Sequence, residues 1–218
     1  CTSLESVKFL GTSLDMYDTF LFNGCTSLRE VNIPSDLTYI EEGMFYNCTS
    51  LQQVVIPENV VTIGFYTFHY SGLTSIVIPS SVKNYVSYTI KSKKEALDSV
   101  SSDKEPFQFC NYLVSAEVNS TALPNYMFAG DENLASVDMP NVITVGMYAF
   151  KNCVNLNGVV LNKGLTSLGN SAFVGCSSLT SITIPSKIVK IGSSVFSGCS
   201  SLKNVTFEGK LTEIGSSA

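Results

Sequence analysis

Cysteine is the residue type in this 218-residue chain whose spacing first suggests chemistry. Six cysteines each lie three residues after a Phe and three residues before a Leu: Cys25, Cys48, Cys110, Cys153, Cys176 and Cys199. There is no C-x-x-C pair, and a soft-metal site needs several ligands that converge on one point, so we predict no metal site. We expect reduced, buried thiols instead of disulfides, because equivalent positions in a stack direct their Cβ bonds in parallel.

The single histidine and two pairs of adjacent acids are the other candidates for catalysis. His69 lies in the turn-like stretch F-H-Y with no cysteine nearby in the chain, so a thiol–imidazole pair is not indicated. A surface or turn position is expected for it. Two pairs of adjacent acids could act in general acid–base catalysis, namely Glu41 with Glu42 and Asp131 with Glu132. Adjacent acids in loops are usually solvated, however. No glycine-rich phosphate loop is present. The sequence therefore predicts no catalytic residue and no cofactor.

A 23-residue repeat positions these residues, and it is clearest between Phe173 and Val195. A fixed period of this length indicates a stack of similar supersecondary units. Within a unit, the pattern L-x-x-[VI]-x-[IFLM] ends in the alternation of a short strand, and a Pro often follows. A second apolar group and a Gly come next, where the glycine serves a positive φ or a close backbone approach. One unit cannot cover its own apolar side, so neighbours must stack into a solenoid of about nine units.

The full pattern F-x-x-C-x-x-L-x-x-[VI]-x-I-P-x-x-[VI]-x-x-I-G resembles the BspA-like class of leucine-rich repeat over nearly the whole chain. The resemblance implies a right-handed repeat solenoid with one parallel β-sheet on the concave side. Turns and short irregular or 3-10 segments would form the convex side. Members of the class are mostly surface or secreted proteins of host-associated bacteria, with some in protists, and are regarded as adhesion or binding proteins. The resemblance supplies no defined ligand and no catalytic motif.

The chain is expected to form a single repeat domain over residues 1–218, interrupted by a charged insertion at 86–106. Tyr85 precedes Phe107 by 22 residues, whereas the equivalent Ile191 precedes Phe196 by five. Insertions in solenoids often lie on a binding face, although a solvated excursion is the alternative because long loops cost little entropy. Its candidate contact residues are Lys91, Lys93, Lys94 and Glu95. Both ends of the sequence fall within the repeat array, so we expect this chain to be part of a longer protein.

Side chains that point out of the predicted sheet are the other candidate binding surface. They are mostly small and polar, but some are valines. An exposed valine can contact a partner, or it can be present because β-branched residues favour strands. By alternation the candidates are Glu30, Asn32, Gln53, Val55, Ser75, Val77, Glu117, Asp138, Val160 and Thr183.

The net charge of the chain limits the kinds of partner that it is expected to bind. The net charge is −5, which argues against nucleic-acid binding through a basic stripe and against adsorption to anionic membranes. No apolar run is long enough to span a bilayer. We therefore expect a non-enzymatic protein- or glycan-binding module of a cell-surface or secreted protein, with adhesion to a host as one role. The alternative is a structural spacer that holds another domain away from the cell surface.

Overall fold

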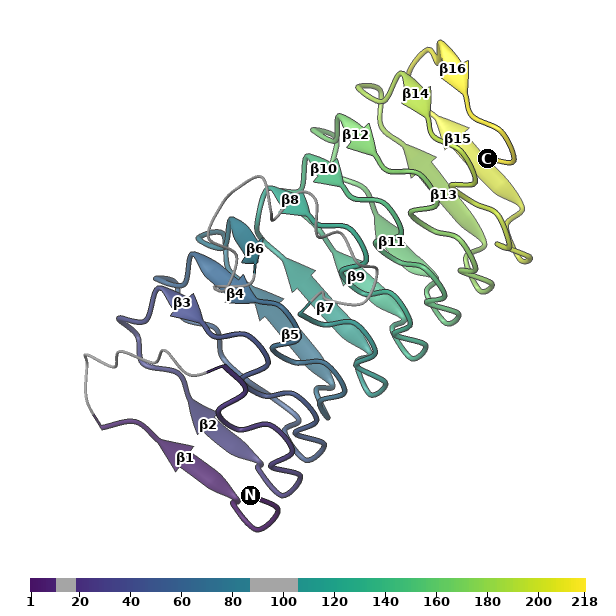
Figure 1. The fold of residues 1–218 in the computed structure, drawn as a ribbon. Helices are drawn as coiled ribbons and strands as arrows, with labels where there is room; N and C mark the ends of the chain where they lie inside the picture. Colours follow the sequence, from purple (N-terminus) through teal and green to yellow (C-terminus); the bar gives the residue numbers. More distant parts are fainter. Residues whose placement is uncertain (11–18, 87–105) are drawn as a thin grey trace.

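The computed structural model describes residues 1–10, 19–86 and 106–218, which wind into a solenoid of stacked parallel strands (Figure 1). The two ends of the chain lie at opposite ends of the stack. Each unit contributes three sides, which we name the long-strand side, the short-strand side and the turn side. Among the described residues no helix has the length and apolar character needed to cross a membrane.

The long-strand side contains strands of three or four residues. They are β1 (Ser6–Lys8), β2 (Glu30–Asn32), β5 (Ser75–Ile78), β7 (Ser115–Val118), β9 (Ser136–Asp138), β11 (Gly158–Val160), β13 (Ser181–Ile184) and β15 (Asn204–Phe207). In β5 and β13 exposed and buried residues alternate strictly, because successive side chains of a strand point to opposite faces. This is the parallel sheet side that the repeat pattern predicts.

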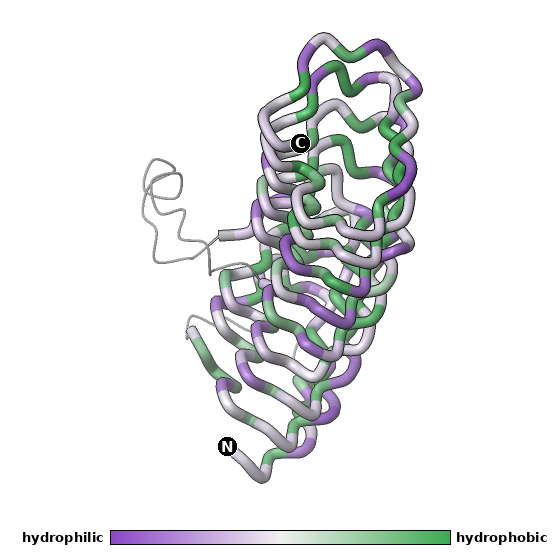
Figure 2. The backbone as a smooth tube through the Cα atoms, turned by 90° about the vertical axis from the view of Figure 1, so that its right-hand side faces the viewer, coloured by the Kyte–Doolittle hydropathy of each residue, from purple (hydrophilic) through white to green (hydrophobic). Residues whose placement is uncertain are grey.

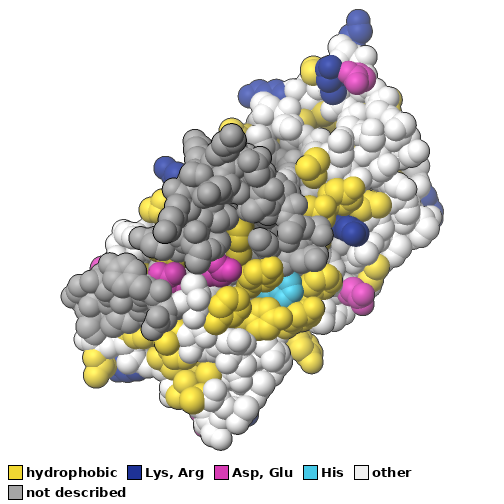
Figure 3. All heavy atoms as spheres, in the orientation of Figure 1, with side chains coloured by type: hydrophobic (Ala, Val, Ile, Leu, Met, Phe, Trp, Pro, Cys, Tyr) yellow, Lys and Arg dark blue, Asp and Glu magenta, His cyan; other side chains and the backbone are white. Residues whose placement is uncertain are grey.

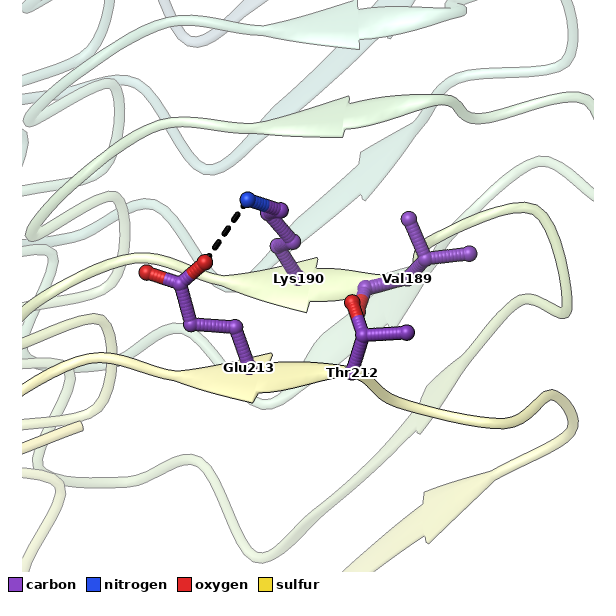
Figure 4. A network of polar contacts seen from close by, with 4 residues as sticks. All are labelled: Val189, Lys190, Thr212 and Glu213. Carbon is purple, nitrogen blue, oxygen red and sulfur yellow. Dashed lines mark hydrogen bonds and ion pairs between the residues drawn. The ribbon is translucent and has the colours of Figure 1, made fainter.

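The short-strand side is a second row of strands that the sequence analysis did not predict. They are β3 (Tyr39–Ile40), β4 (Thr62–Gly64), β6 (Asn84–Val86), β8 (Ala122–Leu123), β10 (Thr144–Val145), β12 (Ser167–Leu168), β14 (Lys190–Ile191) and β16 (Glu213–Ile214). In β3, β4, β8, β10, β12 and β14 a buried apolar residue anchors the strand in the core. Figure 4 shows one exposed pair on this side, in which Lys190 Nζ lies 2.7 Å from Glu213 Oε2 and Thr212 lies beside Val189.

The turn side closes each unit and carries the repeated Phe into the core. Backbone N–H groups of one turn donate to carbonyls of the next, as from Phe150 to Ala172 at 2.8 Å. The rings form a ladder with neighbouring centroids 5.1 to 6.0 Å apart from Phe22 through Phe196. Figure 2 shows hydrophobic positions recurring at the same places in successive units, which is how stacking buries the core.

The recurring glycine at the end of the short strand is required by close packing. A Cβ atom at Gly169 would lie 2.5 Å from the carbonyl carbon of Gly146, and one at Gly146 would lie 2.5 Å from the backbone nitrogen of Asn125. Positive φ values belong to other glycines, such as Gly175 and Gly198 at 76° on the turn side. Of the two roles expected for this glycine, the structure therefore shows the close backbone approach.

The strand ladders are interrupted, whereas the repeat pattern predicts one continuous sheet. On the long-strand side the paired groups are β1–β2, β5–β7–β9–β11 and β13–β15, and on the short-strand side they are β3–β4–β6, β8–β10–β12 and β14–β16. The segment 53–56 continues the long-strand row without strand pairing. Both rows are interrupted between the unit of β11 and β12 and the unit of β13 and β14.

Candidate binding surface

The outward-facing candidates all lie exposed or partly exposed on the long-strand side. Their order along the stack is Glu30, Asn32, Gln53, Val55, Ser75, Val77, Glu117, Asp138, Val160 and Thr183. The charged insertion residues Lys91, Lys93, Lys94 and Glu95 fall outside the described residues, so their role stays a prediction.

The strand register brings four of these candidates into one row across the central sheet. Val77 pairs with Glu117, Glu117 with Asp138, and Asp138 with Val160. Val77 and Val160 are 52% and 74% exposed. The amide of Asn119 donates to Glu117 Oε1 at 2.7 Å, which orients this carboxylate. Like charges on adjacent strands are unfavourable, so fold stability does not explain the acidic pair.

An open hollow of about 780 Å³ lies at the N-terminal end of this side. Lys8, Arg29, Glu30, Gln53 and Val55 are among the residues that line it. It therefore offers both charges and an amide group beside an exposed valine. Such a mixed lining suits a polar partner surface better than a small apolar ligand.

Asn32 has a structural task at the edge of that hollow. Its side-chain oxygen accepts a hydrogen bond from the backbone N–H of Phe9 at 2.9 Å, and its amide donates to the carbonyl of Phe9 at 3.3 Å. These bonds extend the β1–β2 pairing by one residue, so Asn32 is less suited to bind a ligand than its exposed position suggests.

A second hollow of about 250 Å³ lies between β11 and β13, with Val160, Lys163, Thr183 and Glu208 in its lining. This second hollow lies at an interruption of the long-strand ladder, whereas the first extends from the paired strands β1 and β2 over the unpaired segment 53–56. Each hollow thus adjoins a place where strand pairing ends.

The cysteine column has a structural explanation in the geometry. The thiols of Cys153, Cys176 and Cys199 each donate to the carbonyl oxygen of the Phe in the preceding unit, at 3.0 to 3.1 Å. Burial raises the pKa of Cys48 to about 12 and that of Cys199 to about 11. All seven cysteines are free thiols, and all but Cys1 are buried. A nucleophilic cysteine needs a lowered pKa, so the thiols of Cys48 and Cys199 are not suited to catalysis.

Two acids that were expected to be solvated are buried, and that expectation was wrong. Asp131 is fully buried in the cysteine column, and burial raises its pKa well above the usual range, although the hydrogen bond from the backbone N–H of Cys110 partly opposes this. Glu41 is 5% exposed, and burial, followed by repulsion from Glu42, raises its pKa to about 7. The position of Asp131 in the repeat was the available signal, because that column points inward.

His69 lies in a turn, as one of its two expected positions had it, but the alternative of a surface position was wrong. Its side chain is 4% exposed and packs among aromatic rings of the turn side. The ring centroids of Tyr46, Phe109 and Tyr70 lie 5.6, 5.3 and 4.5 Å from that of the imidazole. Figure 3 shows hydrophobic side chains gathered around this histidine. Sequence reasoning missed the cluster, because its members are spread over several units and lie outside the core columns.

Within residues 1–10, 19–86 and 106–218, no group of three or more His, Cys, Asp or Glu side chains is arranged to hold a metal ion.

A family model described as "BspA type Leucine rich repeat region (6 copies)" matches residues 1–96 and 121–218. This chain belongs to the BspA-type leucine-rich repeat family. The match runs through the regular units on both sides of the insertion, so the resemblance inferred from the repeat pattern is confirmed. No curated protein matches the chain.

Solved structures of leucine-rich repeat proteins from Bacteroides ovatus and T. pallidum share the fold. A protein from Bacteroides ovatus is 22% identical with a TM-score of 0.65, covering 100% of this chain and 64% of that one. The T. pallidum leucine-rich repeat protein is 20% identical with a TM-score of 0.54, covering 85% and 72%. A leucine-rich cell surface protein from Faecalibacterium prausnitzii is 23% identical with a TM-score of 0.42, covering 96% and 74%. This BspA-type chain therefore spans less than two thirds of the Bacteroides structure.

Proposed function

We propose that this BspA-type chain is a non-enzymatic binding module of a cell-surface or secreted protein, and that it contacts a protein or glycan through its long-strand side. The row Val77–Glu117–Asp138–Val160 carries the proposal. Two exposed valines flank two neighbouring carboxylates, which gives an apolar and acidic contact strip on a rigid sheet. The family supports an extracellular setting, because its members are mostly surface or secreted proteins.

The buried groups support a role without catalysis. The titratable side chains with strongly raised pKa values, such as Asp131 and Cys153, lie inside the core and do not line either hollow of the long-strand side. Catalytic groups with shifted pKa values normally face a cleft that a substrate can enter. The shifts here accompany burial in the stack.

The test is binding of the intact chain to a panel of extracellular matrix proteins and glycans. The informative variant replaces Val77, Glu117, Asp138 and Val160 by threonine, the residue that β13 and β15 carry at this position as Thr183 and Thr206. We expect at least a tenfold loss of affinity with unchanged circular dichroism. The matched control places threonine at Lys190 and Glu213 on the short-strand side, where binding should persist.

A third variant replaces residues 87–105 by a short Gly-Ser linker. Loss of binding in this variant alone would assign the contact to the insertion and contradict the proposed row. Absence of binding by the parent chain across the panel would favour the structural spacer instead.

A further inference from the structure

The outward side chains of the long-strand side change in character along the stack. We define the middle column as the second outward residue of each successive strand position, and its first six members are Lys8, Asn32, Val55, Val77, Glu117 and Asp138. All six side chains are exposed. The column therefore runs from a basic end, through an amide and two valines, to an acidic end.

Two cations at the basic end are available to a partner. Lys8 and Arg29 both line the open hollow of about 780 Å³. Glu5 and Glu30 occupy neighbouring positions, but within residues 1–10, 19–86 and 106–218 neither cation forms an ion pair with a carboxylate. Both cations can therefore pair with a carboxylate of another molecule.

Two carboxylates at the acidic end are available in the same way. Glu117 and Asp138 lie side by side in the strand register, and the repulsion between them favours a partner that brings positive charge. The amide of Asn119 orients Glu117 through one oxygen at 2.7 Å, and no cation of the described part of the chain forms an ion pair with either acid. One side of the molecule thus carries both halves of a charge pairing.

A two-fold axis along the strand direction, placed between segment 53–56 and β5, makes the middle column self-complementary. Such an axis brings the same side of two copies face to face and reverses the direction of the stack. Val55 and Val77, which are 80% and 52% exposed, would then meet at the centre. Each copy would remove apolar surface of the other from water there.

The same axis places opposite charges on both sides of these valines. Lys8 would face Asp138 of the second copy, and Asn32 would face Glu117. Arg29 belongs to the same unit as Asn32 and would approach the same carboxylate. Opposite charges at matching distances from the axis fix the relative position of the two copies.

Axes between other neighbouring rows do not give this match. Between β5 and β7, the axis would set Glu117 against Val77 and Asp138 against Val55. Between β7 and β9, it would set Glu117 against Asp138 of the second copy, and like charges oppose association. Between β2 and the unpaired segment that follows it, Lys8 would face Val77, and both carboxylates would lie beyond β1 of the second copy.

We propose that two copies of this chain associate face to face through their long-strand sides, with opposite stack directions, about this two-fold axis. The pairs Lys8–Asp138 and Arg29–Glu117 each occur twice in the contact and flank the central valines. The contact covers part of the row assigned to a protein or glycan ligand, so a copy in the dimer cannot present that row. The dimer needs no ligand, so either proposal can fail without the other.

The size of the contact predicts a weak and reversible dimer. Six rows about 4.8 Å apart and about 17 Å wide cover roughly 500 Å² per chain, which is at the lower end for specific interfaces. The hollow at the basic end would lie opposite the rows of Glu117 and Asp138, where it provides space for their carboxylates. We therefore expect a dissociation constant in the micromolar range.

The test is sedimentation equilibrium of the whole chain from about 5 to 500 µM, in 50 mM and in 500 mM NaCl. We expect a monomer–dimer equilibrium whose dissociation constant rises at least tenfold at the higher salt concentration, because exposed charges are screened. A monomer at every concentration in 50 mM NaCl would overturn the proposal.

Reversal of charge locates the contact. Lys8→Glu and Asp138→Lys should each weaken the dimer at least tenfold, because each sets like charges against each other twice. The chain that carries both substitutions regains opposite charges, and its dissociation constant should return to within threefold of the parent. A correctly folded double variant, as judged by circular dichroism, that stays monomeric would refute this pairing.

A second reciprocal pair and a control complete the design. Arg29→Glu with Glu117→Lys should show the same loss and recovery, and it replaces the first pair if that one folds poorly. Lys187→Glu makes the same change of charge in the exposed loop between β13 and β14, outside the contact, and should leave the dimer unchanged. Equal weakening by Lys187→Glu and Lys8→Glu would show that net charge controls association and would contradict the proposed contact.

Discussion

The Oδ1 atom of Asp131 accepts a hydrogen bond from the backbone N–H of Cys110 at 2.7 Å inside the core. Neighbouring units fill this column with a thiol that donates to a Phe carbonyl of the preceding unit, as Cys153 does to Phe128. The second carboxyl oxygen, Oδ2, is buried without a hydrogen-bond partner. A carboxyl group therefore occupies a place that the repeat shapes for a small, weakly polar side chain, and burial holds its pKa well above the usual range.

Replacing Asp131 by the consensus residue of its column should stabilise the protein. Asp131→Cys removes an incompletely satisfied buried carboxyl group, and we expect a gain of about 1–3 kcal/mol in the free energy of unfolding at pH 7. Because the folded pKa is raised, the folded state keeps a proton that the unfolded state releases above about pH 4, so the parent loses stability as pH rises. Urea denaturation at pH 5 and pH 7 tests this. Equal pH slopes in parent and variant would contradict it.

Glu41 should produce a second pH dependence in a defined window. Its pKa is raised from 4.5 to about 7 by burial and then by Glu42, so the folded state binds its proton more tightly than the unfolded state does. Its contribution is complete below about pH 4.5 and is lost as pH rises through 7. Glu41→Gln should reduce the fall of the melting temperature between pH 4.5 and 7. A pH slope in Glu41→Gln as steep as that of the parent would refute the assignment.

The cysteines should differ widely in their reaction with iodoacetamide. Cys1 is exposed, whereas burial raises the pKa of Cys48 to about 12, so at pH 8 roughly one molecule in ten thousand carries its thiolate. We expect complete alkylation of Cys1 before any measurable alkylation of Cys48, Cys110, Cys153 or Cys176. Mass spectrometry of tryptic peptides resolves the sites. Labelling of all seven thiols in denaturant is the control, and native labelling of Cys153 at the rate of Cys1 would contradict the buried column.

Adding a methyl group at Gly169 should disturb the stack. The new Cβ would lie 2.5 Å from the backbone of Gly146 and Met147, which cannot move as a side chain can. We expect Gly169→Ala to lower the free energy of unfolding by about 1–3 kcal/mol. Gly158→Ala is the matched control, because β7, β9 and β13 carry Ser115, Ser136 and Ser181 at this position. Thermal denaturation of both variants measures the difference, and equal melting temperatures would contradict the close approach.

The sequence predicts the features that recur with the period. The Phe ladder, the inward cysteines and the outward row from Glu30 to Thr183 follow directly from position in the unit. The close approach at Gly169 was one of two expected explanations, and choosing between them needed the backbone distances. Repetition makes such residues predictable, because each is surrounded by copies of itself.

Features that depend on departures from the period could not be predicted in the same way. The burial of His69 arises from contacts among rings of different units, and the pattern of one unit does not contain them. The interruption between β11 and β13 likewise depends on how neighbouring units are spaced. Asp131 is an intermediate case, because its column indicates an inward position although its residue type suggests solvent.

The coincident interruption of both strand rows between β11/β12 and β13/β14 has a mechanical consequence. Across this joint the turn side stays connected by the Phe150–Phe173 contact at 5.1 Å and by the bond from the Cys176 thiol to the carbonyl of Phe150. The other two sides lack strand pairing there. On those sides the two neighbouring units are held by core packing and by single hydrogen bonds, such as the one from the Ser178 N–H to the Val154 carbonyl at 3.0 Å. We therefore expect bending of the stack to be easiest at this joint, and a partner that contacts both β11 and β13 to oppose it.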